Sequence, residues 1–278
     1  VRTSEGMLRM LRVDFDWLQS TDSVMARVRE HQPLIQCLTN TVTTNFVANA
    51  ILAVGASPAM VDIPGEAGLL ARSAGAVLVN LGTPSADQRE AMLLAAGVAA
   101  EAGTPWVLDP VGVGMLPVRT ALARRLLELR PTVIRGNASE IRVLAGQGGG
   151  GRGVDSTDEV DAVRSAAVEL AQATGAVVAV SGSVDLITDG REVVRIANGD
   201  PMLTRITGAG CALGGVMAAF IAVGADPLAA SVVAGTAYAV AGELASARAE
   251  HPGSFIPAML DALSAIDAAT VLERGRLS

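Results

Sequence analysis

The segment 203–211 contains the residues whose types and spacing best suit catalysis. It ends in Gly208, Ala209, Gly210 and Cys211, where an extended run is expected to turn through two glycines into a helix. The first N–H groups of a helix lack intrahelical acceptors and lie at the positive end of its dipole, so they can bind a transferring phosphoryl group. This field should lower the pKa of the Cys211 thiol and make it a base or nucleophile. The alternative is that the glycines only permit close helix packing and Cys211 is a small apolar residue.

Two further segments place acidic residues where predicted strands end. Asp109 follows a strand predicted at 106–108, and ligands bind beyond the carboxyl ends of parallel strands, so Asp109 is either a metal or substrate ligand or an ordinary turn residue. Glu140 lies three residues after Asn137, which is the spacing of a capping box and, for this pair alone, the stronger interpretation. Arg135 precedes them. Together with the glycine turn, these residues would supply Mg²⁺ ligands, a phosphate clamp and an oxyanion site.

A fourth polar segment follows the strand predicted at 34–38. Asn40 or Thr41 could cap the next helix, and Asn45 inside that helix could face a ligand. Spacing does not decide between these roles.

The elements that must position these residues follow an α/β pattern. Short apolar runs alternate with longer helical patterns from residue 33 onward, which predicts a mostly parallel central sheet with helices on both faces. Two apolar segments around Asp189 and Gly190 predict an antiparallel hairpin at the sheet edge. The remainder, 210 to about 268, is predicted to be helical, with Pro227 at a helix start. Strands are predicted at 34–38, 58–61, 76–81, 106–108, 133–135 and 177–180, and helices at 43–54, 67–73, 86–101, 118–129 and 157–173.

We expect one domain, 16–278, preceded by a loose extension at 1–15 that lacks the apolar run of a secretory signal. The glycine run at 146–153 contains G-x-G-x-x-G, but it follows a predicted helix rather than a strand. We therefore interpret it as a connecting loop and not as a dinucleotide site.

The composition narrows the chemistry further. A net charge of -7 and a pI near 4.9 argue against binding to nucleic acid or to an anionic membrane. The chain has no lysine, which excludes a Walker-A loop and a lysine Schiff base, and its 2 His and 2 Cys lie too far apart in sequence to suggest a zinc site. The uncharged stretch 206–225 is better explained by two buried helices than by a membrane span. Two cysteines in a chain of this length suggest a reducing compartment, so we expect a cytoplasmic location.

Five segments, in this order, resemble the hydroxyethylthiazole kinase family of the ribokinase-like superfamily: 37–40, 52–60, 108–112, 134–140 and 206–211. The resemblance covers about residue 33 to the C-terminus. It implies a ribokinase-like fold and ATP-dependent phosphorylation of the primary alcohol of 4-methyl-5-(2-hydroxyethyl)thiazole, a salvage step of thiamine biosynthesis. It also implies Mg²⁺ as cofactor and a homotrimer with active sites at subunit interfaces.

The resemblance also implies roles for individual residues. Met60 and Gly208 would contact the substrate, with Asn40 on the same side. Arg135 and Ser181 would contact ATP, together with Asn137; most family members have Thr where this chain has Ser181, and either hydroxyl can donate to a phosphate. Asp109 and Glu140 correspond to acids near the Mg²⁺ ions. Cys211 stands where most ribokinase relatives have an Asp that acts as base.

Two other functions stay open at this point. One is a ribokinase-like kinase for another small alcohol, such as a hydroxymethylpyrimidine or a sugar, and Cys211 in place of Asp argues against it. The other is a nucleotide-binding paralogue without turnover. Retention of Asp109, Glu140 and the glycine turn argues against that.

Overall fold

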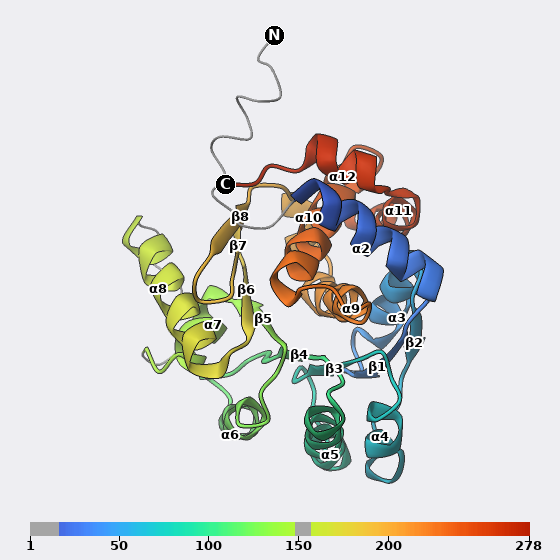
Figure 1. The fold of residues 1–278 in the computed structure, drawn as a ribbon. Helices are drawn as coiled ribbons and strands as arrows, with labels where there is room; N and C mark the ends of the chain where they lie inside the picture. Colours follow the sequence, from blue (N-terminus) through green and yellow to red (C-terminus); the bar gives the residue numbers. More distant parts are fainter. Residues whose placement is uncertain (1–16, 148–156) are drawn as a thin grey trace.

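The computed structural model describes residues 17–147 and 157–278, so the predicted extension at 1–15 and most of the predicted glycine loop lie outside it. Within this part of the chain, eight strands form one sheet in the order β2-β1-β3-β4-β5-β6-β7-β8 (Figure 1). The first six pair in parallel, and β7 and β8 add an antiparallel hairpin at one edge, as predicted. The strands are β1 (Leu34–Leu38), β2 (Ser57–Ala59), β3 (Ala76–Asn80), β4 (Trp106–Asp109), β5 (Val133–Asn137), β6 (Val177–Ser181), β7 (Asp185–Thr188) and β8 (Val193–Ile196).

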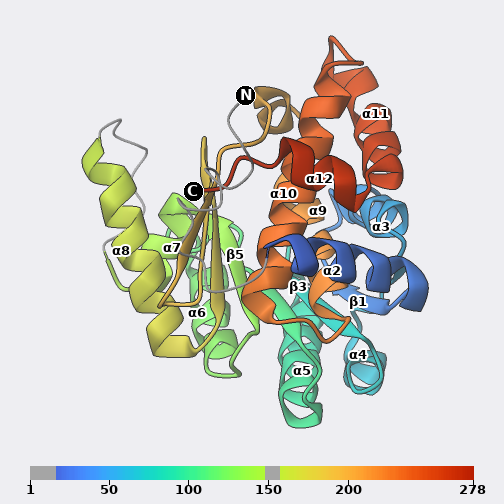
Figure 2. The same cartoon turned by 45° about the horizontal axis from the view of Figure 1, so that its top comes forward.

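Helices cover both faces of the sheet, which confirms the predicted α/β architecture (Figures 1 and 2). On one face, the helices that contact the strands are α3 (Thr44–Ala53), α9 (Ala209–Ile221) and α10 (Pro227–Ser246). The helices that pack over them are α2 (Trp17–His31), α11 (Pro252–Ala265) and α12 (Ala268–Arg274). The other face packs against α4 (Pro64–Ala71), α5 (Ala86–Ala102), α6 (Pro117–Leu127), α7 (Ala138–Leu144) and α8 (Thr157–Thr174).

Alternation along the strands decides which side chains face α9. In β3, Leu78 belongs to the core on the α9 side, whereas Val77 and Val79 belong to the core under α4 and α5. Because strand side chains alternate between faces, Asn80 points to the same side as Leu78. In β4, Val107 belongs to the core on the α9 side, and Asp109 lies two residues later, so the Asp109 side chain also points to that side.

α10 is long and apolar enough to cross a membrane by length and composition alone, but 89% of that stretch is buried inside the protein. It is therefore a core helix. The uncharged stretch 206–225 contains the loop before α9 and then α9 itself, rather than two helices.

The segment before α9 differs from the extended run that was predicted. Residues Pro201–Arg205 form a 3₁₀ turn, because Pro201 favours the first helical position and the side chain of Asp200 accepts a hydrogen bond from the N–H of Met202 at 2.8 Å. The chain becomes extended only at Ile206. Helix α2 was not predicted either.

Candidate active site

Six neighbouring strands end in polar or sulfur-containing residues at one edge of the sheet. The chain moves from β1 outward to β2 and returns to β3, so the direction of winding reverses between β1 and β3. Such a reversal is where parallel α/β sheets bind ligands. In sheet order from β2 to β6, the residues in or just after these strand ends are Met60, Asn40, Asn80, Asp109, Arg135 and Ser181.

The predicted glycine turn is present at the start of α9. Gly208 has φ +91° and is the N-cap of the helix, and an added Cβ would lie 2.7 Å from the Thr43 methyl carbon. A Cβ on Gly210 would overlap the guanidinium of Arg135. The glycines therefore let the first turn of α9 approach Arg135 and Thr43 closely.

Arg135 is the cation at the centre of the site and is 9% exposed. Its Nη2 donates to Ser181 Oγ at 2.8 Å, and its Nη1 lies 3.7 Å from Asp109 Oδ2. Its Nε has no hydrogen-bond partner among the described residues. The side chain thus links β4, β6 and the glycine turn, and keeps a buried donor without a protein partner.

Asp109 is fully buried. Its Oδ2 accepts a hydrogen bond from Asn80 Nδ2 at 2.7 Å, whereas its Oδ1 accepts none from any described residue. The pKa of Asp109 is raised to about 7, chiefly by burial; the Arg135 guanidinium and the Asn80 hydrogen bond oppose this rise, and the nearby Glu140 carboxylate adds to it. A buried carboxylate oxygen without a partner is suited to a cation.

Glu140 and Asn137 form the predicted capping box of α7. Asn137 Oδ1 accepts from the N–H of Glu140 at 3.0 Å, and Glu140 Oε2 accepts from the N–H of Asn137 at 2.9 Å. Glu140 Oε1 also accepts from the N–H of Gly112 at 3.0 Å. The capping interpretation is confirmed, and each Glu140 oxygen keeps further acceptor capacity.

The donor set fits Mg²⁺. Asp109 has an oxygen without a protein partner, and the charge of Glu140 acts on it. Among the described residues, no group of three or more His, Cys, Asp or Glu side chains could hold a metal alone. Mg²⁺ is usually bound by one or two protein carboxylates plus substrate phosphates and water, so two acids suffice.

Asn40 does not act as the N-cap of α3, and neither does Thr41, because the N-cap residue is Thr43. The Asn40 side chain accepts from the N–H of Thr43 at 3.2 Å. Its Nδ2 donates to Asn80 Oδ1 at 2.9 Å and to Cys211 Sγ at 3.3 Å. Asn40 is thus brought to the catalytic cysteine candidate, whereas Asn45 is exposed and receives a hydrogen bond from Asn49.

The predicted lowering of the Cys211 pKa is wrong. Burial raises the pKa of this thiol, the negative charge of Asp109 raises it further, and hydrogen bonds from neighbouring polar side chains, including Asn40, oppose the shift only in part. Cys211 is therefore mostly a thiol at neutral pH.

Sequence reasoning missed two residues of the site. Asn80 ends β3 directly opposite Asp109, and the parity and position that single out Asp109 apply to it equally. Tyr238, in α10, donates from its hydroxyl to the backbone oxygen of Ala209 at 2.8 Å and braces the glycine turn. No local sequence signal marks Tyr238.

Met60, a predicted substrate contact, is half-buried and directly follows β2, which lies two strands away from β3 and Asn80.

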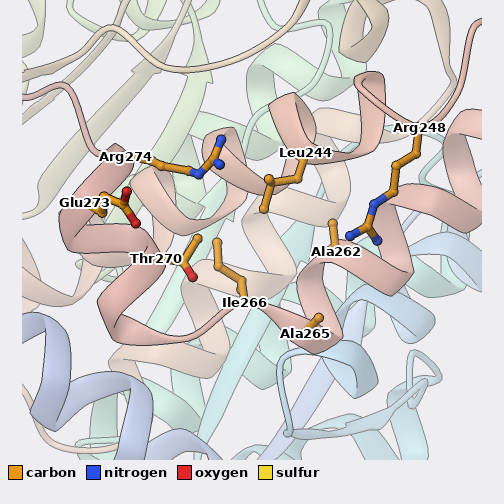
Figure 3. Close-up of a pocket in the computed structure, with 8 residues that line it drawn as sticks. All are labelled: Leu244, Arg248, Ala262, Ala265, Ile266, Thr270, Glu273 and Arg274. Carbon is orange, nitrogen blue, oxygen red and sulfur yellow. The ribbon is translucent and has the colours of Figure 1, made fainter.

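A separate cavity of about 290 Å³ lies between α10, α11 and α12 (Figure 3). Its lining includes Leu244, Arg248, Ile266 and Glu273. None of the predicted site residues lines it.

Comparisons with known proteins identify the family. The model described as the hydroxyethylthiazole kinase family matches residues 25–269. A hydroxyethylthiazole kinase from Clavibacter sepedonicus is 56% identical over 255 residues, which cover 92% of this chain and 93% of that protein. A solved structure of a hydroxyethylthiazole kinase protein from Pyrococcus horikoshii OT3 matches with a TM-score of 0.87 at 34% identity, covering 94% of this chain and 98% of that one.

More distant structures share the fold alone. The pyridoxal kinase from Staphylococcus aureus, solved in complex with pyridoxal, matches with a TM-score of 0.58 at 20% identity over 76% of this chain and 87% of that one. The sequence relationship over most of the chain is closer and specific: the chain belongs to the hydroxyethylthiazole kinase family.

Proposed function

We propose that this protein transfers the γ-phosphoryl group of ATP to the primary alcohol of 4-methyl-5-(2-hydroxyethyl)thiazole. The observation that carries the proposal is the Arg135 guanidinium packed against the glycine turn of α9 and beside Oδ2 of the buried Asp109, whose Oδ1 has no hydrogen-bond partner among the described residues. Phosphoryl transfer depends mainly on alignment and charge stabilisation, and this arrangement supplies both without a lysine.

Each group has a distinct part in the proposed reaction. The amides at Gly208–Gly210 and the free Nε of Arg135 hold the transferring phosphoryl group, and Ser181 fixes the Arg135 side chain. Asp109 and Glu140 would hold Mg²⁺, which when bound neutralises phosphate charge. Asn137, the N-cap of α7, would contact the nucleotide.

Cys211 remains the proposed base for the alcohol proton. Its sulfur accepts a hydrogen bond from Asn40, a donor that stabilises a thiolate. Because the pKa of the thiol is raised, only a small fraction is ionised at neutral pH. The proposed base is therefore most effective above neutral pH. Asn40 and Gly208 would also contact the substrate, and Met60 would line the thiazole pocket.

We also propose a homotrimer in the cytoplasm. The two cysteines, Cys37 and Cys211, are free thiols, which supports a reducing compartment.

The apolar surface of α10 is buried within the chain, so it does not support assembly of the trimer. The trimer is supported instead by large exposed apolar side chains on α3 and α4, those of Leu52 and Leu69. Light scattering would measure the number of chains in each particle, which should be three.

A substrate panel tests the proposed specificity. The value of kcat/KM should be highest for the thiazole alcohol and lower for a hydroxymethylpyrimidine, pyridoxal and ribose. A preference for one of the other alcohols would overturn the assignment while leaving the kinase fold intact.

A further inference from the structure

A chain of buried side-chain hydrogen bonds runs through Asn80, a residue with 0% exposure. Asn80 Nδ2 donates to Asp109 Oδ2 at 2.7 Å. Asn80 Oδ1 accepts from Asn40 Nδ2 at 2.9 Å and from the N–H of Gly82 at 3.0 Å. Asn40 Nδ2 also donates to Cys211 Sγ at 3.3 Å. Asn80 thus lies between Asp109, the proposed metal ligand, and the side chain of Asn40, which donates to Cys211, the proposed base.

Two backbone N–H groups fix the direction of every bond in this chain. The N–H of Gly82 can only donate, so the Asn80 atom facing it is the oxygen, and the NH₂ group must face Asp109. The N–H of Thr43 likewise faces Asn40 Oδ1, so the Asn40 NH₂ group must face Asn80 and Cys211. The sulfur therefore receives a hydrogen bond.

Close packing keeps this arrangement in place. A Cβ on Gly82 would lie 2.6 Å from the Asn40 side chain, so Gly82 permits the approach that the bond to Asn80 requires. Asn80 and Asp109 lie opposite each other in the register of β3 and β4. Neither amide can rotate without leaving a backbone N–H unpaired in the interior.

We propose that Asn80 is a positioning residue that turns the partnerless oxygen of Asp109 toward the phosphoryl site and the amide of Asn40 toward the Cys211 sulfur. It touches neither substrate in this role and acts through its two neighbours. The inference rests on the proposed function, because that function places Asp109 and Cys211 in the reaction.

The variant Asn80→Asp tests the proposal, since it keeps the size of the side chain and the acceptor for Gly82 and loses the donor to Asp109. We expect kcat to fall about 10- to 100-fold, the range for misplaced reacting groups, with little change in KM for ATP or the alcohol. The carboxylate at position 80 also adds a negative charge near Cys211 and competes with the sulfur for the Asn40 amide, so alkylation of Cys211 by iodoacetamide at one fixed pH should slow by about tenfold.

Asn198→Asp is a matched control. Asn198 is also buried. Its side chain accepts a hydrogen bond from the backbone N–H of Arg276 and donates one to the carboxylate of Glu243, as Asn80 does with Gly82 and Asp109. None of these bonds leads to Asn80. This variant should lower the melting temperature to a similar extent and leave kcat and the alkylation rate as in the wild type.

Three results would overturn the proposal: an unchanged kcat in folded Asn80→Asp, an equal loss of kcat in Asn198→Asp, or an unchanged alkylation rate. If Asn80→Asp does not fold, Asn40→Asp replaces it, because that variant keeps the acceptor for Thr43 and loses both donors, and it must then show the same losses. Wild-type protein that does not phosphorylate the thiazole alcohol would refute the proposed function instead, and the alkylation rates would still test the role of Asn80.

Discussion

At the scale of single residues, two buried groups carry unusual pKa values for the same physical reason. Burial disfavours the charged form of both Asp109 and Cys211, and a neighbouring negative charge raises each pKa further: that of Glu140 for Asp109, and that of Asp109 for Cys211. Cys37 is different, since burial alone raises its pKa to about 12 and it lies outside the polar site. Only Cys211 combines partial exposure with hydrogen-bond donors.

The pH dependence of turnover follows from the raised pKa of Cys211. If its thiolate takes the alcohol proton, kcat should increase as pH rises above neutral, because ionisation requires a pH near the raised pKa. Cys211→Asp should remove this rise, since a carboxylate at 211 is ionised earlier, and should retain activity. Cys211→Ala should be slower than wild type by about 10²-fold. Steady-state rates from pH 6 to 9 measure this, and an alanine variant as fast as wild type would leave Cys211 a packing role only.

The buried carboxyl of Asp109 should lower the free energy of unfolding of the ligand-free protein at neutral pH. Its folded pKa of about 7 exceeds the unfolded value of 3.8, so its favourable contribution is complete below about pH 4 and is lost as pH rises toward 7. Asp109→Asn should therefore raise the free energy of unfolding at pH 8, by about 2 kcal/mol, and abolish most turnover. Urea unfolding at pH 4 and pH 8 measures the difference, which should shrink at pH 4. A variant less stable than wild type at pH 8 would contradict the account.

At the scale of elements, the first turn of α9 should tolerate no side chain at Gly210. A Cβ there would overlap the Arg135 guanidinium, so Gly210→Ala should displace the arginine and lower kcat/KM for ATP about 10²-fold. Gly97→Ala in α5 is the control, because a Cβ there meets nothing within 4 Å, and it should stabilise the fold by about 0.5–1 kcal/mol with full activity. Equal activity of the two variants would show that Arg135 does not need this contact.

The start of α7 combines a structural and a proposed catalytic role in Glu140. Its two oxygens accept from different backbone N–H groups, those of Gly112 and Asn137, so Glu140→Gln turns an NH₂ group against one of them. We expect a loss of about 1–2 kcal/mol in unfolding free energy and a fall in turnover of at least tenfold that excess Mg²⁺ partly restores. Intact turnover with only the stability loss would mean that Glu140 is a cap and not a metal ligand.

At the scale of the whole molecule, the sequence predicted the architecture because strand and helix periods are local signals. The six parallel strands and the edge hairpin occur near their predicted positions, and the sheet edge that gathers Asp109, Arg135 and Glu140 follows from parallel strand ends. The capping box at Asn137 and the glycine turn at Gly208 are equally local, and both are confirmed.

The remaining features depend on distant contacts that spacing does not reveal. The raised pKa of Cys211 arises from burial and from Asp109, more than 100 positions earlier in the chain. Tyr238 reaches Ala209 only because α10 packs beside α9. Asn80 lay inside the strand predicted at 76–81, and only the observed end of β3 at Asn80 places it opposite Asp109.

The central claim is that this chain phosphorylates the thiazole alcohol, and ADP formation by the purified protein tests it most directly. With ATP and MgCl₂ present, ADP should form only when 4-methyl-5-(2-hydroxyethyl)thiazole is added, in equal amount to a phosphate monoester of that alcohol. Arg135→Ala, which removes the buried cation beside the glycine turn, should abolish most of this activity. ADP formation that does not depend on the thiazole alcohol, or none in its presence, would contradict the account.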